Sequence, residues 1–335
     1  GLPVPRVPAD NPMSEAKVSL GRSLFYDTRL SGNQTYSCAS CHVQAHAFTD
    51  GRAAAIGSTG QAHARSTMSL ANVAYNASYG WADGATRTLE AQMAVPMFNE
   101  HPIELGLKGR EAEIEARFRT STDAARFREA FSGDAEPVRL GNIVKAIASF
   151  ERTIVSAGSP LDRYLYRDDR SAMSPAALRG MTLYFSERLA CGFCHGGFNL
   201  SGPTDHDGSE PVTPTFHNTA LYHIDGRGAY PAPDRGLFDL TGKPSDMGSF
   251  RAPTLRNVAV TAPYMHDGSV PTLEAAIAHY ATRGVASPLR SPRLKGFTLT
   301  PAETSDLLAF LLALTDEHFL VDPAYGRPSS PIAFQ

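Results

Sequence analysis

The chain has 335 residues, of which 42% are hydrophobic and 19% charged, enough for one large or two ordinary domains with hydrophobic cores. Its 31 Lys and Arg against 34 Asp and Glu give a formal net charge of -3, so no overall positive field attracts it to nucleic acid. The longest wholly apolar run, Leu307–Leu314, is far too short to cross a membrane, so we expect a globular chain without a transmembrane segment.

Helical patterns recur along the chain. Apolar residues at helical spacing, most of them behind a residue that can cap a helix, mark the segments 14–26, 140–155, 174–185, the stretch from Thr272 and the stretch from Thr300. The last of these opens with Thr-Pro-Ala-Glu, a capping box with proline at the first helical position. Alternating strand patterns are scarce, and residues 201–249, rich in Gly, Pro and Asp, are predicted to form a long loop.

All four cysteines belong to two copies of one short motif. The two copies are Cys38-x-x-Cys41-His42 and Cys191-x-x-Cys194-His195. Cys-x-x-Cys-His is the attachment signature of a c-type haem, in which the thiols bind the porphyrin and the adjacent histidine lies under the iron as its proximal ligand. We therefore predict two covalently bound haem c groups.

Other uses of these cysteines fit less well. A four-cysteine zinc site would not require a histidine after both pairs, and a thioredoxin-like redox motif would be expected to follow a strand. Disulfides would leave the two histidines unexplained.

Two haem motifs about 150 residues apart predict two haem domains rather than one multihaem cluster. The segments 14–26 and 174–185, which precede the motifs, look alike and indicate an internal duplication. The predicted fold class is all-α, with two cytochrome c-like haem domains and long loops. The predicted domains are residues 1–160 and residues 161–335.

Two longer motifs resemble a known family. The stretch from Phe250 to Ser269, which contains Arg-Ala-Pro-Thr-Leu-Arg-Asn and Tyr-Met-His-Asp-Gly-Ser, resembles a signature of the bacterial dihaem cytochrome c peroxidase and MauG superfamily. Trp81-Ala-Asp-Gly and the following Leu89-Glu-Ala-Gln92 also match it. The resemblance covers nearly the whole chain and implies export, with hydrogen peroxide as the oxidant. The block from Gln92 onward is most similar to the MauG-like MbnH branch.

The resemblance implies different roles for the two haems. His42 would hold the peroxide-reactive haem, and His195 the electron-transfer haem. Trp81 resembles the tryptophan between the haems, through which electrons hop; the alternative is an aromatic residue of the core, and a large ring can serve both purposes.

Gln92, Pro96 and Glu104 resemble the distal residues of the reactive haem. A carboxylate is needed there because peroxide must lose a proton from one oxygen and regain it on the other before the O–O bond breaks. Residues 99–106 form a segment two residues longer than the usual peroxidase version, so Glu100 is a rival to Glu104.

The sixth ligand of the second haem separates the subfamilies. Peroxidases of this family carry a methionine there, whereas MauG-like enzymes carry a tyrosine, and Tyr280 occupies the matching position. A phenolate ligand favours ferric and higher oxidation states of iron. The alternatives are a tyrosine of the helix core, or ligation by His279 or Met265.

A switching histidine is absent from its expected place. Family members that need reductive activation carry it near the position of Ser58, so a permanently open reactive haem is predicted; His63 is close enough to remain an alternative.

The family also has a calcium ion between the haems. Thr261 and Pro263 match its carbonyl ligands, but Ser66 replaces an asparagine, and a hydroxyl is a poorer ligand, so calcium stays open.

The leading functional hypothesis is a peroxide-dependent oxidoreductase. It would store both oxidising equivalents in a high-valent two-haem state and oxidise an aromatic side chain, a tryptophan, of a partner protein through Trp81. In the MbnH branch the partner is a copper-binding protein, and its tryptophan becomes kynurenine. The alternatives are a cytochrome c peroxidase, with electrons from a small cytochrome or cupredoxin, and a non-enzymatic electron-transfer cytochrome, whose first iron would take a ligand such as His46, His63 or Met68. Haem c attachment predicts a periplasmic location, and so export; a signal peptide is absent from this chain, which is compatible with a mature, processed or trimmed start.

Overall fold

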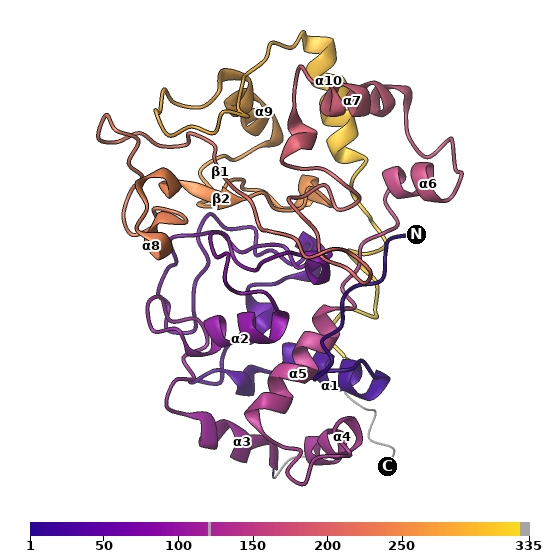
Figure 1. Ribbon diagram of the computed structural model, residues 1–335. Coiled ribbons are helices and arrows are strands. Elements are labelled where there is room, and N and C mark those ends of the chain that lie inside the picture. Colours follow the sequence, from indigo (N-terminus) through magenta and orange to yellow (C-terminus); the bar gives the residue numbers. More distant parts are fainter. Residues whose placement is uncertain (120–121, 329–335) are drawn as a thin grey trace.

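The computed structural model describes residues 1–119 and 122–328, and the regular structure in this part is mostly helical (Figure 1). The helices are α1 (Glu15–Phe25), α2 (Leu89–Phe98), α3 (Glu111–Arg119), α4 (Asp123–Ala130), α5 (Leu140–Glu151), α6 (Pro160–Tyr166), α7 (Pro175–Phe185), α8 (Phe238–Thr241), α9 (Leu273–Thr282) and α10 (Pro301–Leu312). The strands are β1 (Phe216–Asn218) and β2 (Ser249–Arg251). Helices α1 to α5 occupy the lower half of Figure 1, and α6, α7, α9 and α10 the upper half.

The capping residues predict where the helices begin. Ser14 accepts a hydrogen bond from the Lys17 amide at 3.2 Å, and Ser174 accepts one from the Ala177 amide at 3.1 Å. The capping box at Thr300 is present as predicted. These side chains satisfy amide groups that have no partner inside the helix, and so they fix each helix start.

The all-α description is incomplete, although the mostly helical character is confirmed. Within the predicted loop 201–249, β1 pairs with β2 in antiparallel fashion, with His217 opposite Phe250. The short helix α8 also lies there. Each strand has only three residues, too few to show an alternating pattern, and its partner is distant in sequence.

Each half of the molecule contains one closely packed helix pair. In the first half α1 crosses α5, and in the second half α7 crosses α10. Each crossing has a glycine at its closest point: a methyl group on Gly21 would lie 1.8 Å from the Ala146 carbonyl oxygen, and one on Gly180 would lie 1.9 Å from that of Asp306. Glycine is therefore required at both crossings because the backbones are already in contact.

Replacing Gly180 by alanine is expected to destabilise the protein by about 1–3 kcal/mol, because the added methyl group forces α7 and α10 apart. The free energy of unfolding, measured by chemical denaturation, checks this. The matched control is Gly133→Ala, since no atom lies within 4 Å of a methyl group there. Equal stability of the two variants would contradict the close packing of the helices.

The last part of the chain returns to the first half. Figure 1 shows the segment after α10 running down to the lower half of the molecule. Phe319 joins the hydrophobic core formed around α1 and α5. Tyr26 donates a hydrogen bond to the Tyr325 carbonyl at 2.8 Å, and Gln44 donates to that of Phe319 at 3.0 Å. The domain boundary at residue 160 stays a prediction, and this return is a feature that the sequence does not indicate.

A buried network of hydrogen bonds joins the two halves; we call it the junction and define it by Asn72, Ser156, Asn257 and Asp316. Asn72 exchanges two hydrogen bonds with the Ser156 backbone, at 2.7 and 3.2 Å. Asn257 donates to the Ser156 hydroxyl at 3.0 Å and accepts from the Asp316 amide at 2.8 Å. Both asparagines have left-handed backbone, with φ of 58° and 60°, which asparagine tolerates better than most residues. They occupy equivalent places in the repeated sequence Leu-x-Asn-Val-Ala.

A buried ion pair stands beside the junction. The Arg256 guanidinium binds the Asp162 carboxylate with two hydrogen bonds, at 2.7 and 2.9 Å, and both side chains are almost completely buried. Arg256 also donates to the Phe198 carbonyl, so its charge is well satisfied.

In the part of the chain that the structure describes, no helix has the length and apolar character needed to cross a membrane.

Candidate active site

Both motif histidines are held in the same way. Nδ1 of His42 lies 2.8 Å from the Phe48 carbonyl oxygen, and Nδ1 of His195 lies 2.9 Å from that of Pro253. A carbonyl only accepts, so Nδ1 carries the proton in each ring and Nε2 keeps its lone pair. Burial lowers the pKa of both histidines, for His195 to about 4. Each ring is thus neutral and oriented as an iron ligand requires.

The cysteines of each motif have the same local backbone. Cys38 and Cys191 each begin a single 3-10 turn, and the amide of the following histidine, His42 or His195, donates to the carbonyl of that first cysteine at 3.0 Å. This turn places both thiols and the imidazole on one short segment. The residues therefore fit a covalently attached haem at both motifs.

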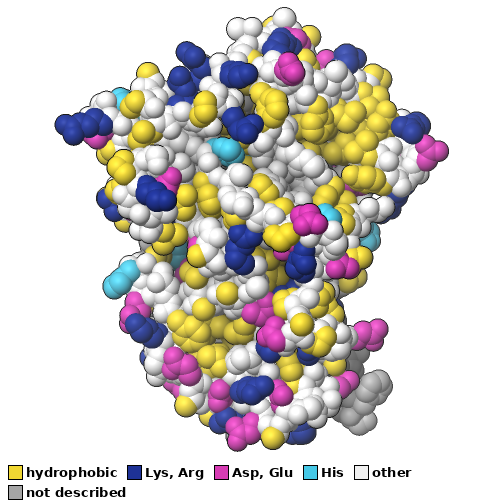
Figure 2. Space-filling model, in the orientation of Figure 1, with side chains coloured by type: hydrophobic (Ala, Val, Ile, Leu, Met, Phe, Trp, Pro, Cys, Tyr) yellow, Lys and Arg dark blue, Asp and Glu magenta, His cyan; other side chains and the backbone are white. Residues whose placement is uncertain are grey.

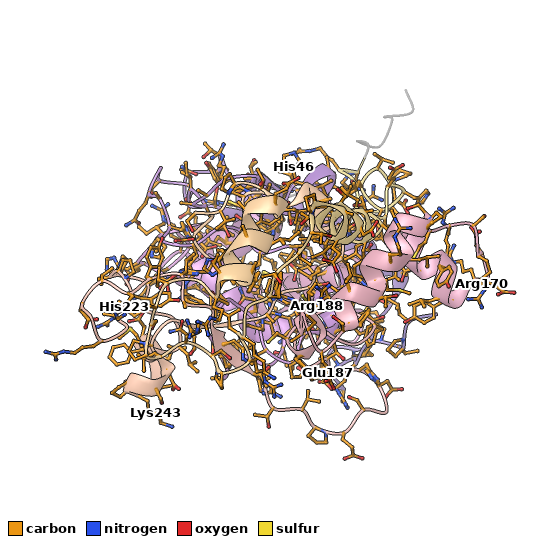
Figure 3. The ribbon with its side chains drawn as sticks, turned by 90° about the horizontal axis from the view of Figure 1, so that it is seen from above. His46, Arg170, Glu187, Arg188, His223 and Lys243 are labelled. Atoms are coloured by element: carbon orange, nitrogen blue, oxygen red, sulfur yellow. The ribbon has the colours of Figure 1, made fainter. Side chains whose placement is uncertain are left out.

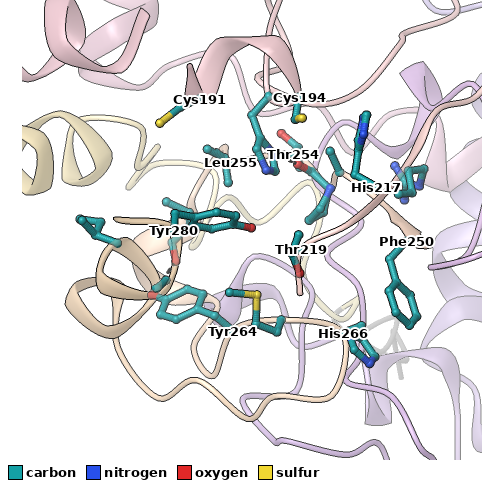
Figure 4. A pocket seen from close by; sticks show the side chains of 18 of the residues that line it. Cys191, Cys194, His217, Thr219, Phe250, Thr254, Leu255, Tyr264, His266 and Tyr280 are labelled. Carbon is teal, nitrogen blue, oxygen red and sulfur yellow. Dashed lines mark hydrogen bonds between the residues drawn. The ribbon is translucent and has the colours of Figure 1, made fainter. Parts of the chain in front are cut away.

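A cavity of about 270 Å³ adjoins the second motif. Cys191, Cys194 and His195 line one side of it, and Tyr280 of α9 lines another. In Figure 4 the Tyr280 ring extends into the cavity with its hydroxyl inward. Among the described residues nothing forms a hydrogen bond with this hydroxyl, and burial raises its pKa well above the usual value. A metal ion is the kind of partner that could deprotonate it.

The rivals of Tyr280 differ in their surroundings. Nε2 of His279 lies 2.9 Å from the Thr219 carbonyl, so this nitrogen is already engaged. Met265 does line the cavity, and its backbone is left-handed, with φ of 71°. The geometry therefore leaves Tyr280 and Met265 facing the space next to His195.

Near the first motif, α2 and the segment after it carry the predicted distal residues. Gln92 and Pro96 are one helical turn apart and thus share a face of α2. The chain then turns back, because the Leu105 amide donates to the Pro96 carbonyl at 2.9 Å, and this return carries Glu104 to the same region. The structure thus brings the three predicted residues together.

The two rival carboxylates are clearly different. Glu100 is exposed and paired with Lys108, which lowers its pKa. Glu104 lies close to the first cysteine pair: burial raises the pKa of the Cys38 and Cys41 thiols, and the Glu104 charge adds to the rise. Burial raises the pKa of Glu104 itself to about 7. A carboxyl group with this pKa can both accept and return a proton near neutral pH.

The loop that carries Ser58 is attached to the Glu104 segment. The Ser58 amide donates to the Glu104 carbonyl at 2.7 Å, and the Ile103 amide donates to the Gln61 side chain at 2.9 Å. His63 lies on the same loop with Nδ1 3.9 Å from a Glu104 oxygen, while its Nε2 is buried without a partner. His63 therefore stands beside the distal carboxylate, and Ser58 is buried.

Trp81 connects the two halves. Its indole N–H donates to the Ser66 carbonyl at 2.9 Å, and its carbonyl accepts from the Arg251 amide at 2.8 Å. The side chain also lines the cavity of the second motif. A position of this kind is compatible with both a relay and a packing role.

The residues of the predicted calcium site gather around the same cavity. Ser66, Thr261 and Pro263 all line it. The Ser66 hydroxyl is engaged with the Met265 carbonyl at 3.2 Å. No group of three or more His, Cys, Asp or Glu side chains suited to a metal ion occurs in residues 1–119 and 122–328. Calcium here would depend on carbonyl and hydroxyl ligands, and its presence stays a prediction.

Two residues near the cavity were not anticipated as site residues. Arg251 is buried, which lowers its pKa to about 10, and it donates to the Gly80 carbonyl and to the Met68 sulfur. His217 of β1 lines the cavity near His195, and burial lowers its pKa. Arg251 stands in the Phe250–Ser269 motif and could have been noticed there, whereas nothing in the loop sequence singles out His217.

The second cysteine pair lies beside an apolar surface. Figure 2 shows hydrophobic side chains gathered over α7 and α10. Phe193, between the two cysteines, is 59% exposed, and Phe185 and Leu312 are 51% and 57% exposed. Exposed aromatic residues next to a redox site are well suited to contact a protein partner.

Known proteins resemble this chain over most of its length. A family model described as di-haem cytochrome c peroxidase matches residues 15–170, and one described as RoxA-like, cytochrome c-like matches residues 249–283. Cytochrome-c peroxidase IdrP1 of Denitromonas iodatirespirans is 37% identical, over 99% of this chain and 90% of that protein. Methylamine utilization protein MauG of Methylorubrum extorquens is 32% identical, over 92% and 81%.

A solved structure is more similar still. It is the crystal structure of a MauG-like protein associated with microbial copper homeostasis. The two chains are 48% identical and superpose with a TM-score of 0.95, over 98% of this chain and 97% of that one.

Proposed function

Because the chain belongs to the family of di-haem cytochrome c peroxidases and MauG, and is a hydrogen-peroxide-dependent dihaem oxidoreductase, we propose that it oxidises an aromatic side chain of a partner protein. The side chain is a tryptophan in this proposal, and Trp81 carries electrons from the second half to the first. Each peroxide molecule takes up two electrons and two protons to give two water molecules. The partner supplies those electrons.

The haem groups would supply the iron that binds peroxide and takes up its oxidising power. His42 would hold one through Nε2, and its ring is fixed by the Phe48 carbonyl. Glu104 accepts the proton that peroxide loses and returns it to the oxygen that leaves as water. Gln92 and Pro96 lie on the adjacent helix face, where they shape the space available to peroxide.

The observation that carries the proposal is the Tyr280 hydroxyl, which faces the cavity beside His195 and has no hydrogen-bond partner within residues 1–119 and 122–328. A phenolate ligand stabilises the oxidised second site, so that oxidising equivalents can be kept there until a slow protein substrate docks. A methionine would favour the reduced site, as ordinary electron uptake from a small donor requires.

The loop that carries Ser58, which is bonded to the Glu104 segment, supports the same proposal. The Ser58 amide is bonded to the Glu104 carbonyl, and a serine cannot ligate the iron as a switching histidine does. The reactive site would therefore accept peroxide without prior reduction. His63 stands beside Glu104, with its Nδ1 3.9 Å from the carboxylate, where it can assist the same proton transfer.

The second candidate function is an ordinary cytochrome c peroxidase, which the name of the IdrP1 relative favours. A non-enzymatic electron-transfer cytochrome is disfavoured, because the family relatives bear the names of peroxidases and of MauG. The solved MauG-like protein is associated with microbial copper homeostasis, and we extend this to the present chain by proposing a copper-handling partner in the periplasm.

Adding one equivalent of hydrogen peroxide to the fully oxidised protein tests the proposal. We expect fast bleaching of the Soret band and a long-lived near-infrared band, because both halves share the oxidising equivalents. In Trp81→Phe the near-infrared band is expected to weaken, because phenylalanine is much harder to oxidise than tryptophan. A reaction that begins only after partial reduction would favour the ordinary peroxidase instead.

A further inference from the structure

An aromatic cluster leads from Trp81 toward the surface. Trp81 and Tyr222 both pack against a small core formed by Ala82, Tyr230 and Phe250. The ring centres of Phe250 and Tyr230 are 6.1 Å apart, and those of Tyr230 and Tyr222 are 5.4 Å apart. Trp81 thus shares one core with two neighbouring rings that lead to Tyr222, a tyrosine on the loop after β1.

Tyr222 differs from the other tyrosines in its hydrogen bond. Its hydroxyl donates to the Asp267 carboxylate, and within residues 1–119 and 122–328 it is the tyrosine hydroxyl that is bonded to a carboxylate. By contrast, Tyr230 donates to the amide oxygen of Asn218 at 3.0 Å. An amide oxygen is a very weak base, so Tyr230 cannot pass its proton on, whereas an ionised carboxylate can take one.

The surroundings of Asp267 keep it ready to accept a proton. Burial alone would raise its pKa, but hydrogen bonds from Tyr222 and Ser269 outweigh this effect, and the pKa lies below the usual value. The Ser269 amide donates to the other carboxylate oxygen at 3.0 Å. Asp267 is therefore ionised near neutral pH.

Tyr222 also lies where a protein can reach it. Its side chain is partly exposed, and the next residues form an exposed stretch in which Ile224 is 63% exposed. In Figure 3 the neighbouring His223 lies at the edge of the molecule, on the opposite side from Arg170. The end of the aromatic cluster is thus at the surface and away from the apolar face over α7 and α10.

We propose that Tyr222 is the residue through which electrons from the partner's aromatic side chain enter the protein, with Asp267 as its proton acceptor. This inference rests on the proposed function. Tyr222 gives one electron through the aromatic cluster to the peroxide-oxidised centre and its phenolic proton to Asp267. The neutral tyrosyl radical then takes one electron from the partner's ring, and the proton returns from Asp267. Two such rounds reduce one peroxide molecule to two water molecules.

The experiment adds hydrogen peroxide to the holoprotein without a partner and freezes the sample for electron paramagnetic resonance. The variants are Tyr222→Phe, Asp267→Asn and the control Tyr166→Phe, whose tyrosine is 43% exposed on α6 at the far side of Figure 1 from α8. We expect a tyrosyl radical in the wild type and in Tyr166→Phe, its loss in Tyr222→Phe and a lower yield in Asp267→Asn. Mass spectrometry should find oxidised or cross-linked tyrosine at position 222.

Optical measurements on the same variants distinguish a failure of the Tyr222 inference from a failure of the proposed function. Soret bleaching by peroxide should be as fast in Tyr222→Phe as in the wild type, because Tyr222 takes no part in the proton transfer assigned to Glu104, while the oxidised state should decay more slowly. Bleaching with a radical that persists unchanged in Tyr222→Phe would overturn the inference and leave the proposed function standing. A wild-type protein that does not bleach at all would overturn both.

Discussion

Replacing Glu104 by glutamine is expected to slow the reaction of the oxidised protein with peroxide by about 10²–10⁴-fold, because the amide cannot accept the proton that peroxide must lose. The haem content and the Soret spectrum before peroxide should not change, since Glu104 is not an attachment residue. Stopped-flow bleaching of the Soret band measures the rate. The control is Glu100→Gln, which removes an exposed carboxylate paired with Lys108 and should react at the wild-type rate.

The pH dependence follows from the same carboxyl group. Burial raises the pKa of Glu104 to about 7, and only the ionised form can act as the base. The rate should therefore fall as the pH is lowered through about 7, and this inflection should be absent from Glu104→Gln. An unchanged inflection in that variant would assign the proton transfer to another group, and His63 is the nearest candidate.

Replacing Tyr280 by methionine is expected to raise the reduction potential of the second haem by hundreds of millivolts, on the order of what axial-ligand changes produce within their range of about 0.8 V. Methionine stabilises the reduced state, whereas phenolate stabilises the oxidised one. Spectroelectrochemical titration measures the potential. The long-lived near-infrared band should be lost as well, because the second half can no longer keep an oxidising equivalent.

Met265→Leu is the matched control for this prediction, because Met265 lines the same cavity. Its second haem should keep the wild-type potential. If Met265→Leu changed the potential and Tyr280→Met did not, the ligand would be Met265 and the preference for a MauG-like reaction would lose its main support.

Local signals in the sequence were sufficient for much of this molecule. The two Cys-x-x-Cys-His motifs specify their own turns, because cysteines and histidine lie on one short segment. Ser14 and Thr300 specify helix starts because each side chain accepts a hydrogen bond from the amide three residues further on. Tyr280 is predicted as a ligand from its position in a motif that matches the family. The structure adds that its hydroxyl faces the cavity.

The parts that could not be predicted depend on contacts between distant segments. The Tyr26 hydroxyl donates to a carbonyl 299 residues further along the chain. The sequence around Tyr26 therefore does not predict that the end of the chain packs there. The Tyr222–Asp267 pair spans 45 residues and joins a loop to a motif whose aspartate has no assigned role. The contrast between Glu100 and Glu104 also needed the structure, since both lie in one short segment and differ in their burial and in the pairing of Glu100 with Lys108.

The junction of Asn72, Ser156, Asn257 and Asp316 holds the two halves together through buried hydrogen bonds. A rotation of one half against the other would break several buried hydrogen bonds, and each buried group left unpaired costs about 1–3 kcal/mol. In the proposed reaction, the separation between Glu104 and Tyr222 would then be set during folding. Electrons would cross a fixed medium, and the process would depend on two molecular encounters at the outside, with peroxide and with the donor.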